Sequence, residues 1–246
     1  MSSTDARAAR AALERLLGAD ASLDLPSGFG DAVERYVKLL LDANRQHNLT
    51  RVVDPEAIAR LHLLDSLAAL PWIDAWTPTS ALDLGSGGGI PGIVLALARP
   101  AMSWTLVDSV GKKADVLRSF IEALGLDSVA VIASRAEELG HEPRHREGTD
   151  LVTARAVASL PVLLELALPL ARVGGNLLAW KGPIAKDELR AGRSAARQLG
   201  GGEPSIRPSG WEALGAHRFV IVRKERPTAD RFPRRSGQPS RRPLGQ

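Results

Sequence analysis

The sequence of 246 residues contains no cysteine. This absence excludes disulfide bonds, thiolate nucleophiles and zinc sites built from cysteine, and it is compatible with the cytosol. No apolar run reaches the ~18 uninterrupted residues that a membrane-spanning helix needs. The first residues also lack the basic start and apolar stretch of a secretory signal, so we expect a cytoplasmic protein without a membrane anchor.

Positive and negative residues nearly balance over most of the chain, and the excess of positive charge lies near the C-terminus. The formal net charge is +4, but residues 226–246 contain six Arg and one Asp and therefore carry +5. A basic segment of this kind suggests an anionic partner such as nucleic acid, and the alternative is a segment that only aids solubility. Four prolines interrupt this tail, which we expect to be flexible and to pack no core.

The composition, 44% hydrophobic and 24% charged, is that of a globular protein. The first 75 residues are predicted to be helical. From Val33, apolar residues recur at i, i+3, i+4, i+7 and i+8, which gives one apolar helical face. Asp54 and Pro55 are typical of an N-cap and a first helical position, and we expect the helix that follows to end near Leu70, before Pro71.

From residue 80 onward, short apolar runs alternate with helical patterns. The predicted strands cover residues 80–84, 104–107, 129–133, 150–153, 176–180 and 218–224, and the predicted helices 90–98, 110–124, 160–171 and 185–199. This alternation predicts an α/β fold, a doubly wound Rossmann-like parallel sheet with helices on both faces. We therefore divide the chain into an N-terminal helical cap (1–75), a sheet domain (76–225) and a flexible basic tail (226–246).

Glycines follow the first predicted strand, at positions 85, 87, 88, 89 and 92. They let the backbone turn sharply and let a ligand approach the main chain, although a merely tight loop would look the same. The sequence is not the dinucleotide-binding fingerprint, because Ile90 stands where its third glycine should be, and it is not a phosphate-binding P-loop. We assign Gly85 and Gly87 to a cofactor site at this turn.

Polar residues at the ends of the next strands extend this candidate site. Asp108 ends the second strand, where a carboxylate can accept hydrogen bonds from ribose hydroxyls, and the alternative is a helix N-cap. Ala136 and Glu137 follow the third strand and are candidates for contacts to an adenine, although a helix start alone would explain them. Arg155 follows the fourth strand, where it can hold a cofactor carboxylate or an RNA phosphate, or form only a surface ion pair.

Seven segments, in this order, resemble the bacterial small-subunit ribosomal RNA guanine-N7 methyltransferases, also called the glucose-inhibited division protein B family. They are residues 48–50 (Asn-Leu-Thr), 60–66 (Arg-Leu-His-Leu-Leu-Asp-Ser), 83–92 (Asp-Leu-Gly-Ser-Gly-Gly-Gly-Ile-Pro-Gly), 108–113 (Asp-Ser-Val-Gly-Lys-Lys), 134–138 (Ser-Arg-Ala-Glu-Glu), 155–160 (Arg-Ala-Val-Ala-Ser-Leu) and 181–182 (Lys-Gly). Residues 231–239 also resemble a basic C-terminal extension that some members carry.

The resemblance implies a seven-stranded methyltransferase sheet with an N-terminal helical cap. It implies S-adenosyl-L-methionine as the cofactor and N7 of one guanine in the decoding region of 16S ribosomal RNA as the acceptor. The family's cofactor contacts carry over onto residues that match in type, which are Gly85, Ile90, Ala136, Glu137 and Arg155.

Guanine N7 has a free lone pair, so methylation there needs alignment of donor and acceptor rather than a general base. We accordingly assign no catalytic acid or base and no metal. His62, Asp65, Arg155 and Lys181 are candidates for the RNA side of the cleft, although His62 and Asp65 can also be a simple pair on a helix surface. We expect a monomer that acts on 16S ribosomal RNA or on the small ribosomal subunit.

Three alternatives remain open at this point. The first is a methyltransferase with another acceptor, namely a different RNA, a protein or a small molecule. The second is a nicotinamide-dependent oxidoreductase, which Ile90 disfavours. The third is an RNA-binding or ribosome-assembly factor with a vestigial cofactor site, which the presence of Asp83, Gly85, Gly87 and Asp108 disfavours.

Overall fold

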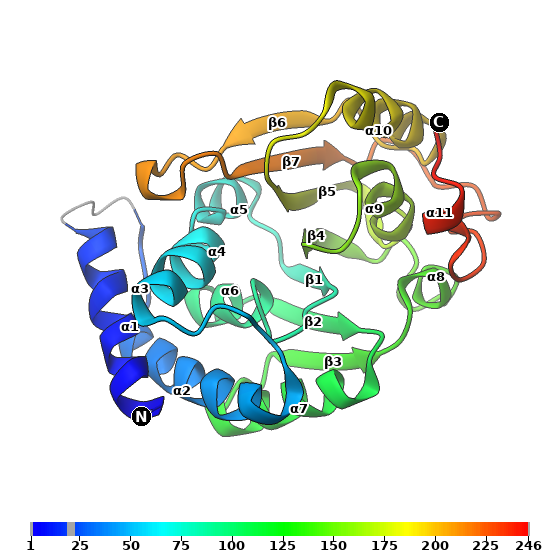
Figure 1. Ribbon diagram of the computed structural model, residues 1–246. Helices are drawn as coiled ribbons and strands as arrows, with labels where there is room; N and C mark the ends of the chain where they lie inside the picture. The colour runs from blue at the N-terminus through cyan, green and yellow to red at the C-terminus, as the bar shows by residue number, and fades with distance from the viewer. Residues whose placement is uncertain (1, 19–22, 246) are drawn as a thin grey trace.

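The structure is a computed structural model that describes residues 2–18 and 23–245, and a seven-stranded sheet is its central element (Figure 1). The strands are β1 (Ser80–Leu84), β2 (Ser103–Asp108), β3 (Val129–Ala133), β4 (Thr149–Arg155), β5 (Ala171–Lys181), β6 (Ser205–Pro208) and β7 (Arg218–Arg223). Their order across the sheet is β3-β2-β1-β4-β5-β7-β6. Neighbours among β1 to β5 are parallel, and β7 pairs antiparallel with β5 and β6. The prediction of a doubly wound Rossmann-like sheet is confirmed.

Helices precede the sheet and connect its strands. The N-terminal ones are α1 (Ser2–Leu17), α2 (Phe29–His47), α3 (Pro55–Ile58), the π-helix η1 (Ala59–Leu64), α4 (Asp65–Leu67) and α5 (Leu70–Trp76). The others are α6 (Gly92–Ala98), α7 (Gly111–Leu124), α8 (Ala136–Leu139), α9 (Leu160–Ala167), α10 (Lys186–Gln198), the 3-10 turn η2 (Glu212–Leu214) and α11 (Gln238–Arg241). Among the residues that the structure describes, none of these helices has the length and apolar character needed to cross a membrane.

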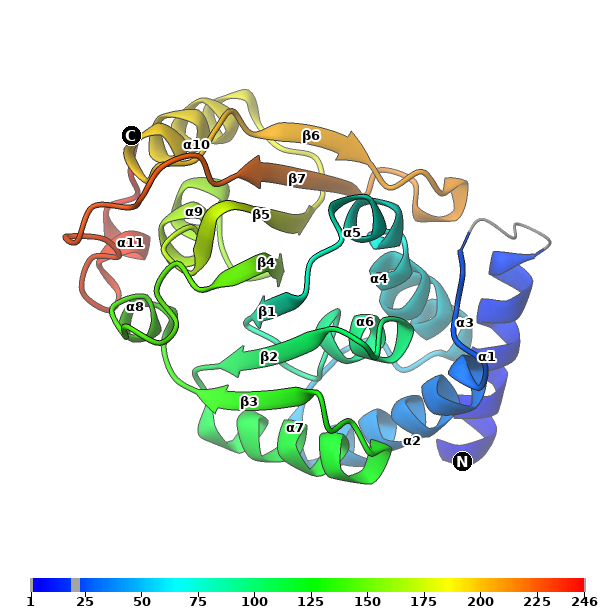
Figure 2. The ribbon, with the colours of Figure 1, turned by 180° about the vertical axis from the view of Figure 1, so that it is seen from behind.

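The sheet separates two hydrophobic cores. Side chains of a strand alternate between its faces, so on β5 Leu178 and Trp180 join one core while Leu177 and Ala179 join the other. The first core lies under the N-terminal helices, α6 and α7, and the second under α9 and α10 (Figures 1 and 2). The N-terminal helices thus share a core with the sheet. The division of the chain into three parts stays a prediction.

Two details of the cap show what the sequence predicted well and badly. Asp54 caps α3 as expected, because its side chain accepts a hydrogen bond of 2.9 Å from the backbone N–H of Ala57. Pro71, however, does not end the helical region. It lies in the first turn of α5, where its missing N–H leaves no hydrogen bond unmade.

The sequence missed β6 and misjudged several boundaries. Only Ile206 in β6 is a large aliphatic residue, so no alternating pattern marked this edge strand. Strand β5 begins at Ala171 rather than at residue 176, with Gly174 and Gly175 inside it, and its pairing with β4 shifts register between Thr149 and Leu151.

The C-terminal segment, residues 226–245, departs most from its prediction. It was expected to be flexible and to pack no core, but Phe232 is 4% exposed and belongs to the second core. It also contains α11, which lies beside α8 and α9 in both views (Figures 1 and 2). The contacts that anchor it join residues far apart in the sequence, and local composition cannot reveal them.

Candidate functional site

The carboxyl ends of the parallel strands carry two adjoining pockets. The strand order reverses between β1 and β4, and open α/β sheets bind ligands at such a switch point. The glycine-loop pocket, of about 230 Å³, is lined by Leu84, Gly85, Val107, Ser109, Ser134, Arg135, Ala136, Glu137, Val157, Ala158, Leu166 and Ser240. The arginine pocket, of about 310 Å³, is lined by Asp65, Arg155, Ala156, Val157, Ala158, Leu163, Trp180, Lys181, Gly182, Pro183, Glu188 and His217. Val157 and Ala158 are common to both.

The glycine loop follows β1 and is bound to its neighbours through the main chain. Gly85 and Ser86 both donate their N–H groups to the carbonyl of Val107, at 2.8 and 2.9 Å. Gly85 has a φ of +73°, and a Cβ added there would lie 2.9 Å from Cγ2 of Val157. Glycine is therefore required for both backbone conformation and space at the point where the loop meets the shared wall of the pockets.

The cap supports the glycine loop from the opposite side. The hydroxyl of Tyr36, on α2, donates a buried hydrogen bond of 2.8 Å to the carbonyl of Gly88. Burial raises the pKa of this hydroxyl, which keeps it protonated and available as the donor. The sequence had placed Tyr36 only on an apolar helical face, and its contact with the loop was missed.

Asp108 fixes the loop from the end of β2. Its Oδ2 accepts from the N–H of Gly87 and its Oδ1 from the N–H of Val110, both at 2.9 Å. Helix α7 starts at Gly111, so Asp108 holds the turn before the helix rather than acting as its N-cap. Each carboxylate oxygen has a second lone pair, which leaves Asp108 able to accept from a bound hydroxyl.

Asp83 joins β1, β4 and α6 below the loop. The side chain is fully buried. It accepts a hydrogen bond of 2.8 Å from the hydroxyl of Thr153 and one of 3.2 Å from the backbone N–H of Gly92. Burial raises the pKa of Asp83 to about 6, although these hydrogen bonds oppose the shift. The folded protein therefore binds a proton at Asp83 more tightly than the unfolded chain does.

This shift predicts a pH dependence of stability that Asp83→Asn removes. Because the folded-state pKa is raised from 3.8 to about 6, the contribution of Asp83 is full below the unfolded pKa and is lost as pH rises through about 6. The loss should reach at most about 3 kcal/mol. Urea unfolding at pH 4 and pH 7.5 should show that the variant gains stability relative to wild type at the higher pH. Parallel pH profiles for the two proteins would contradict the assignment.

Ala136 and Glu137 open α8 at the edge of the glycine-loop pocket. Both are nearly buried, and both line the pocket. Oε1 of Glu137 accepts 2.9 Å from the backbone N–H of Gly237 and lies 3.5 Å from Nη2 of Arg135. Ser240 completes the rim from α11. The sequence predicted the first two residues and missed Gly237 and Ser240.

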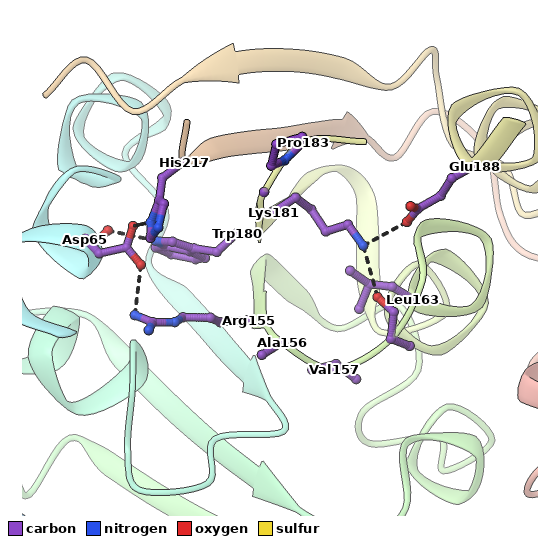
Figure 3. Close-up of a pocket in the computed structure, with 12 residues that line it drawn as sticks. Asp65, Arg155, Ala156, Val157, Leu163, Trp180, Lys181, Pro183, Glu188 and His217 are labelled. Atoms are coloured by element: carbon purple, nitrogen blue, oxygen red, sulfur yellow. Dashed lines mark hydrogen bonds and ion pairs between the residues drawn. The ribbon is translucent and has the colours of Figure 1, made fainter. Parts of the chain in front are cut away.

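Arg155 and Asp65 form an ion pair in the arginine pocket (Figure 3). Nη1 of Arg155 lies 2.9 Å from Oδ2 of Asp65, which is 2% exposed. The other oxygen of Asp65 lies 2.9 Å from Nδ1 of His217, and the Asp65 carbonyl accepts 2.7 Å from Nε1 of Trp180. Asp65 is thus held from three sides. Nη1 of Arg155 is buried against this carboxylate and is paired with it by charge, although within the described residues the contact lacks the geometry of a hydrogen bond.

Lys181 enters the same pocket from the end of β5. Its Nζ donates 2.8 Å to Oε1 of Glu188 and 3.2 Å to the carbonyl of Ala158, as Figure 3 shows for Glu188. Glu188 also accepts 2.7 Å from the N–H of Leu160, and these donors lower its pKa. Lys181 is therefore oriented along the wall that both pockets share.

His62 lies behind Arg155 rather than in either pocket. It is 5% exposed, with Nε2 at 2.8 Å from the hydroxyl of Thr50 and Nδ1 at 3.5 Å from Nη2 of Arg155. Burial and the charge of Arg155 lower the pKa of His62 to about 4, so the imidazole is neutral at pH 7. His62 can orient the guanidinium but does not line the pocket.

The predicted residues therefore fall into three groups. Those that line the glycine-loop pocket are Gly85, Ala136 and Glu137, and those that line the arginine pocket are Asp65, Arg155 and Lys181. Those that line neither pocket are Gly87, Ile90, Asp108 and His62. Gly87 and Asp108 act together in the loop, whereas Ile90 packs against the first core. In residues 2–18 and 23–245, no three His, Cys, Asp or Glu side chains are grouped as metal ligands.

The chain is similar to known proteins over most of its length. A model of the family described as rRNA small subunit methyltransferase G matches residues 30–209. A protein named ribosomal RNA small subunit methyltransferase G from Roseiflexus sp. (strain RS-1) is 45% identical over 211 residues, which cover 85% of this chain and 89% of that protein. A protein of the same name from Symbiobacterium thermophilum is 39% identical, and the match covers 98% of this chain and 100% of that protein.

The fold is also shared with more distant proteins. The crystal structure of the S-adenosylmethionine-dependent methyltransferase SibL in its apo form matches with a TM-score of 0.54 at 17% identity. The match covers 81% of this chain and 77% of that one. At this identity the likeness supports the fold alone.

Proposed function

The chain belongs to the rRNA small subunit methyltransferase G family, and we propose that it methylates N7 of a guanine in the decoding region of 16S ribosomal RNA with S-adenosyl-L-methionine. The observation that carries this proposal is the pair of pockets that meet at Val157 and Ala158. A methyl donor in the glycine-loop pocket and a base in the arginine pocket would meet where the two pockets adjoin.

The glycine-loop pocket fits the donor. Its Gly85 backbone, with no side chain, permits close approach, and Asp108 beside it can accept hydrogen bonds from ribose hydroxyls. Ala136 and Glu137 supply polar groups for an adenine at the far end of the pocket. The group bound there supplies an electrophilic methyl on a sulfonium. The chain's part is to fix that methyl near the shared wall.

The arginine pocket fits a base whose reacting atom carries no proton. The carboxylate of Asp65 is paired with Arg155 and His217, and the carboxylate of Glu188 is paired with Lys181. Neither of these two carboxylates is therefore poised as a base. N7 of guanine needs no base, and alignment is then the main contribution to rate. Arg155 or Lys181, which both line this pocket, would donate to guanine O6 or to a phosphate and leave N7 free.

The assembly state and location follow as part of this proposal. We propose that a monomer of 26.2 kDa is the catalytic unit, because residues of a single chain bring the two pockets together. Its substrate in the small ribosomal subunit would be met in the cytoplasm. Light scattering should give the monomer mass, and a dimer would contradict this part of the proposal.

The acceptor class is tested by offering labelled S-adenosyl-L-methionine to four acceptors side by side. These are deproteinised 16S RNA, intact small subunits, intact large subunits and total protein. We expect label in 16S RNA, free or within the small subunit, and the better of these two substrates identifies the stage of assembly. Label confined to large-subunit RNA or protein would replace the proposed acceptor with another one.

A further inference from the structure

The C-terminal segment, residues 226–245, packs into the second core and is bound there by buried polar contacts. Arg234 donates to the carboxylate of Glu165 from its backbone N–H at 2.9 Å, from Nε at 2.7 Å and from Nη2 at 2.5 Å. Glu165, on α9, is fully buried, and in the described part of the chain Arg234 makes all the side-chain hydrogen bonds to it. Without the segment, a carboxylate in the second core would lose its partners.

A second anchor comes from the loop after α8. Arg146 donates from Nη1 to the carbonyl of Phe232 at 2.8 Å and from Nη2 to that of Thr228 at 2.6 Å. The same Nη1 also donates a hydrogen bond of 2.7 Å to the carbonyl of Gly140, at the end of α8. One guanidinium therefore ties the C-terminal segment to the helix that borders the glycine-loop pocket.

The anchored segment then reaches the pocket itself. Gly237 donates its N–H to Oε1 of Glu137, and Ser240, on α11, stands on the rim with Ala136. Both views place α11 next to α8 (Figures 1 and 2). One residue that lines the pocket, Ser240, therefore lies more than 80 positions after the ends of strands β1 to β4.

We infer that α11 and the turn before it, residues 237–241, are a structural part of the nucleoside end of the cofactor site and set its affinity. The contact with Gly237 fixes one oxygen of Glu137 and leaves Oε2 as an acceptor, which suits the amino group of an adenine. The Ser240 hydroxyl, at the rim, can donate and accept. This inference rests on the proposed function, because it takes the pocket to receive the adenosine of S-adenosyl-L-methionine.

The inference also changes the role of the positive charge in this segment. Within this segment, Arg234 is held by Glu165 and is not free to neutralise phosphates. The segment's first task is then to complete a small-molecule pocket. Contacts to RNA are left to its exposed arginines, which are Arg226, Arg231, Arg235, Arg241 and Arg242.

The test is equilibrium binding of S-adenosylhomocysteine and of adenosine, measured by titration calorimetry on three variants of the full protein. A chain ending at Ser236 keeps Phe232 and Arg234 but lacks α11. Ser240→Trp places an indole at the pocket rim. The control Ser236→Trp places the same indole on an exposed position of the C-terminal segment that precedes residues 237–241 and does not line the glycine-loop pocket. Thermal melting of each variant separates binding from folding.

The shortened chain and Ser240→Trp should weaken the binding of both ligands by about tenfold or more, whereas Ser236→Trp should bind them within about twofold of wild type. Equal loss for adenosine and S-adenosylhomocysteine places the effect at the nucleoside end. Wild-type affinity in both of the first two variants, or a lower melting temperature without weaker binding, would overturn the inference. A wild-type protein that binds neither ligand would instead overturn the proposed function, and the inference with it.

Discussion

Replacing Arg155 with Ala is expected to lower the rate of methyl transfer to the small ribosomal subunit by about 100-fold or more. The change removes the guanidinium that faces the arginine pocket and that would orient the base. Because Arg155 lines the arginine pocket and not the glycine-loop pocket, the affinity for S-adenosylhomocysteine should change far less than the rate. Single-turnover methylation and titration calorimetry measure the two quantities separately.

The same variant leaves Asp65 buried without its cation, which is expected to cost about 3 kcal/mol of stability. Adding Asp65→Asn removes the unpaired charge and should restore most of that stability. Methyl transfer should stay low in the double variant, because the guanidinium is still missing. Recovery of activity together with stability would show that Arg155 has only a structural role, and a normal rate in Arg155→Ala alone would remove it from the site.

Replacing Asp108 with Ala is expected to weaken S-adenosylhomocysteine binding by about 100-fold. Both of its oxygens hold loop N–H groups, from Gly87 and Val110, and the variant leaves these two donors without acceptors. It also removes the acceptor that we assign to the ribose hydroxyls. Titration calorimetry with S-adenosylhomocysteine measures the effect directly.

Asp115→Ala is a matched control for this prediction. Asp115 lies one turn into α7 and is exposed, and among the residues that the structure describes it pairs only with Arg118 on the same helix. Its loss should therefore leave binding unchanged. If Asp108→Ala bound as tightly as Asp115→Ala, the ribose contact and the support of the loop would both be wrong. Asp108→Asn should fall between wild type and Asp108→Ala, because its amide can accept from only one of the two N–H groups.

Much of the fold followed from periodicity in the sequence. Short apolar runs between helical patterns predicted all five parallel strands, β1 to β5. Strand β6 was missed because an edge strand of four residues with one large aliphatic side chain has no pattern to read. The packing of the C-terminal segment was missed because it depends on Phe232 and on the pair of Arg234 with Glu165, 69 positions away in the sequence.

The candidate site was predictable where chemistry follows a strand end. Gly85, Ala136, Arg155 and Lys181 were found in this way and line the pockets. His62 was grouped with Asp65 because both lie on one helix, but the π-helix η1 and burial direct it behind Arg155. His217, Glu188 and Ser240 lie on elements that carry no motif, and only the tertiary fold brings them to the pockets.

The most direct test of the account is the position of the methyl group on the RNA. Small subunits methylated by the enzyme are reduced with borohydride and treated with aniline, which cleaves the strand at N7-methylguanine, and primer extension then maps the cut. The account predicts one new stop, at a single guanine in the decoding region of 16S RNA. Label incorporated without any such cleavage, or cleavage outside the decoding region, would contradict it.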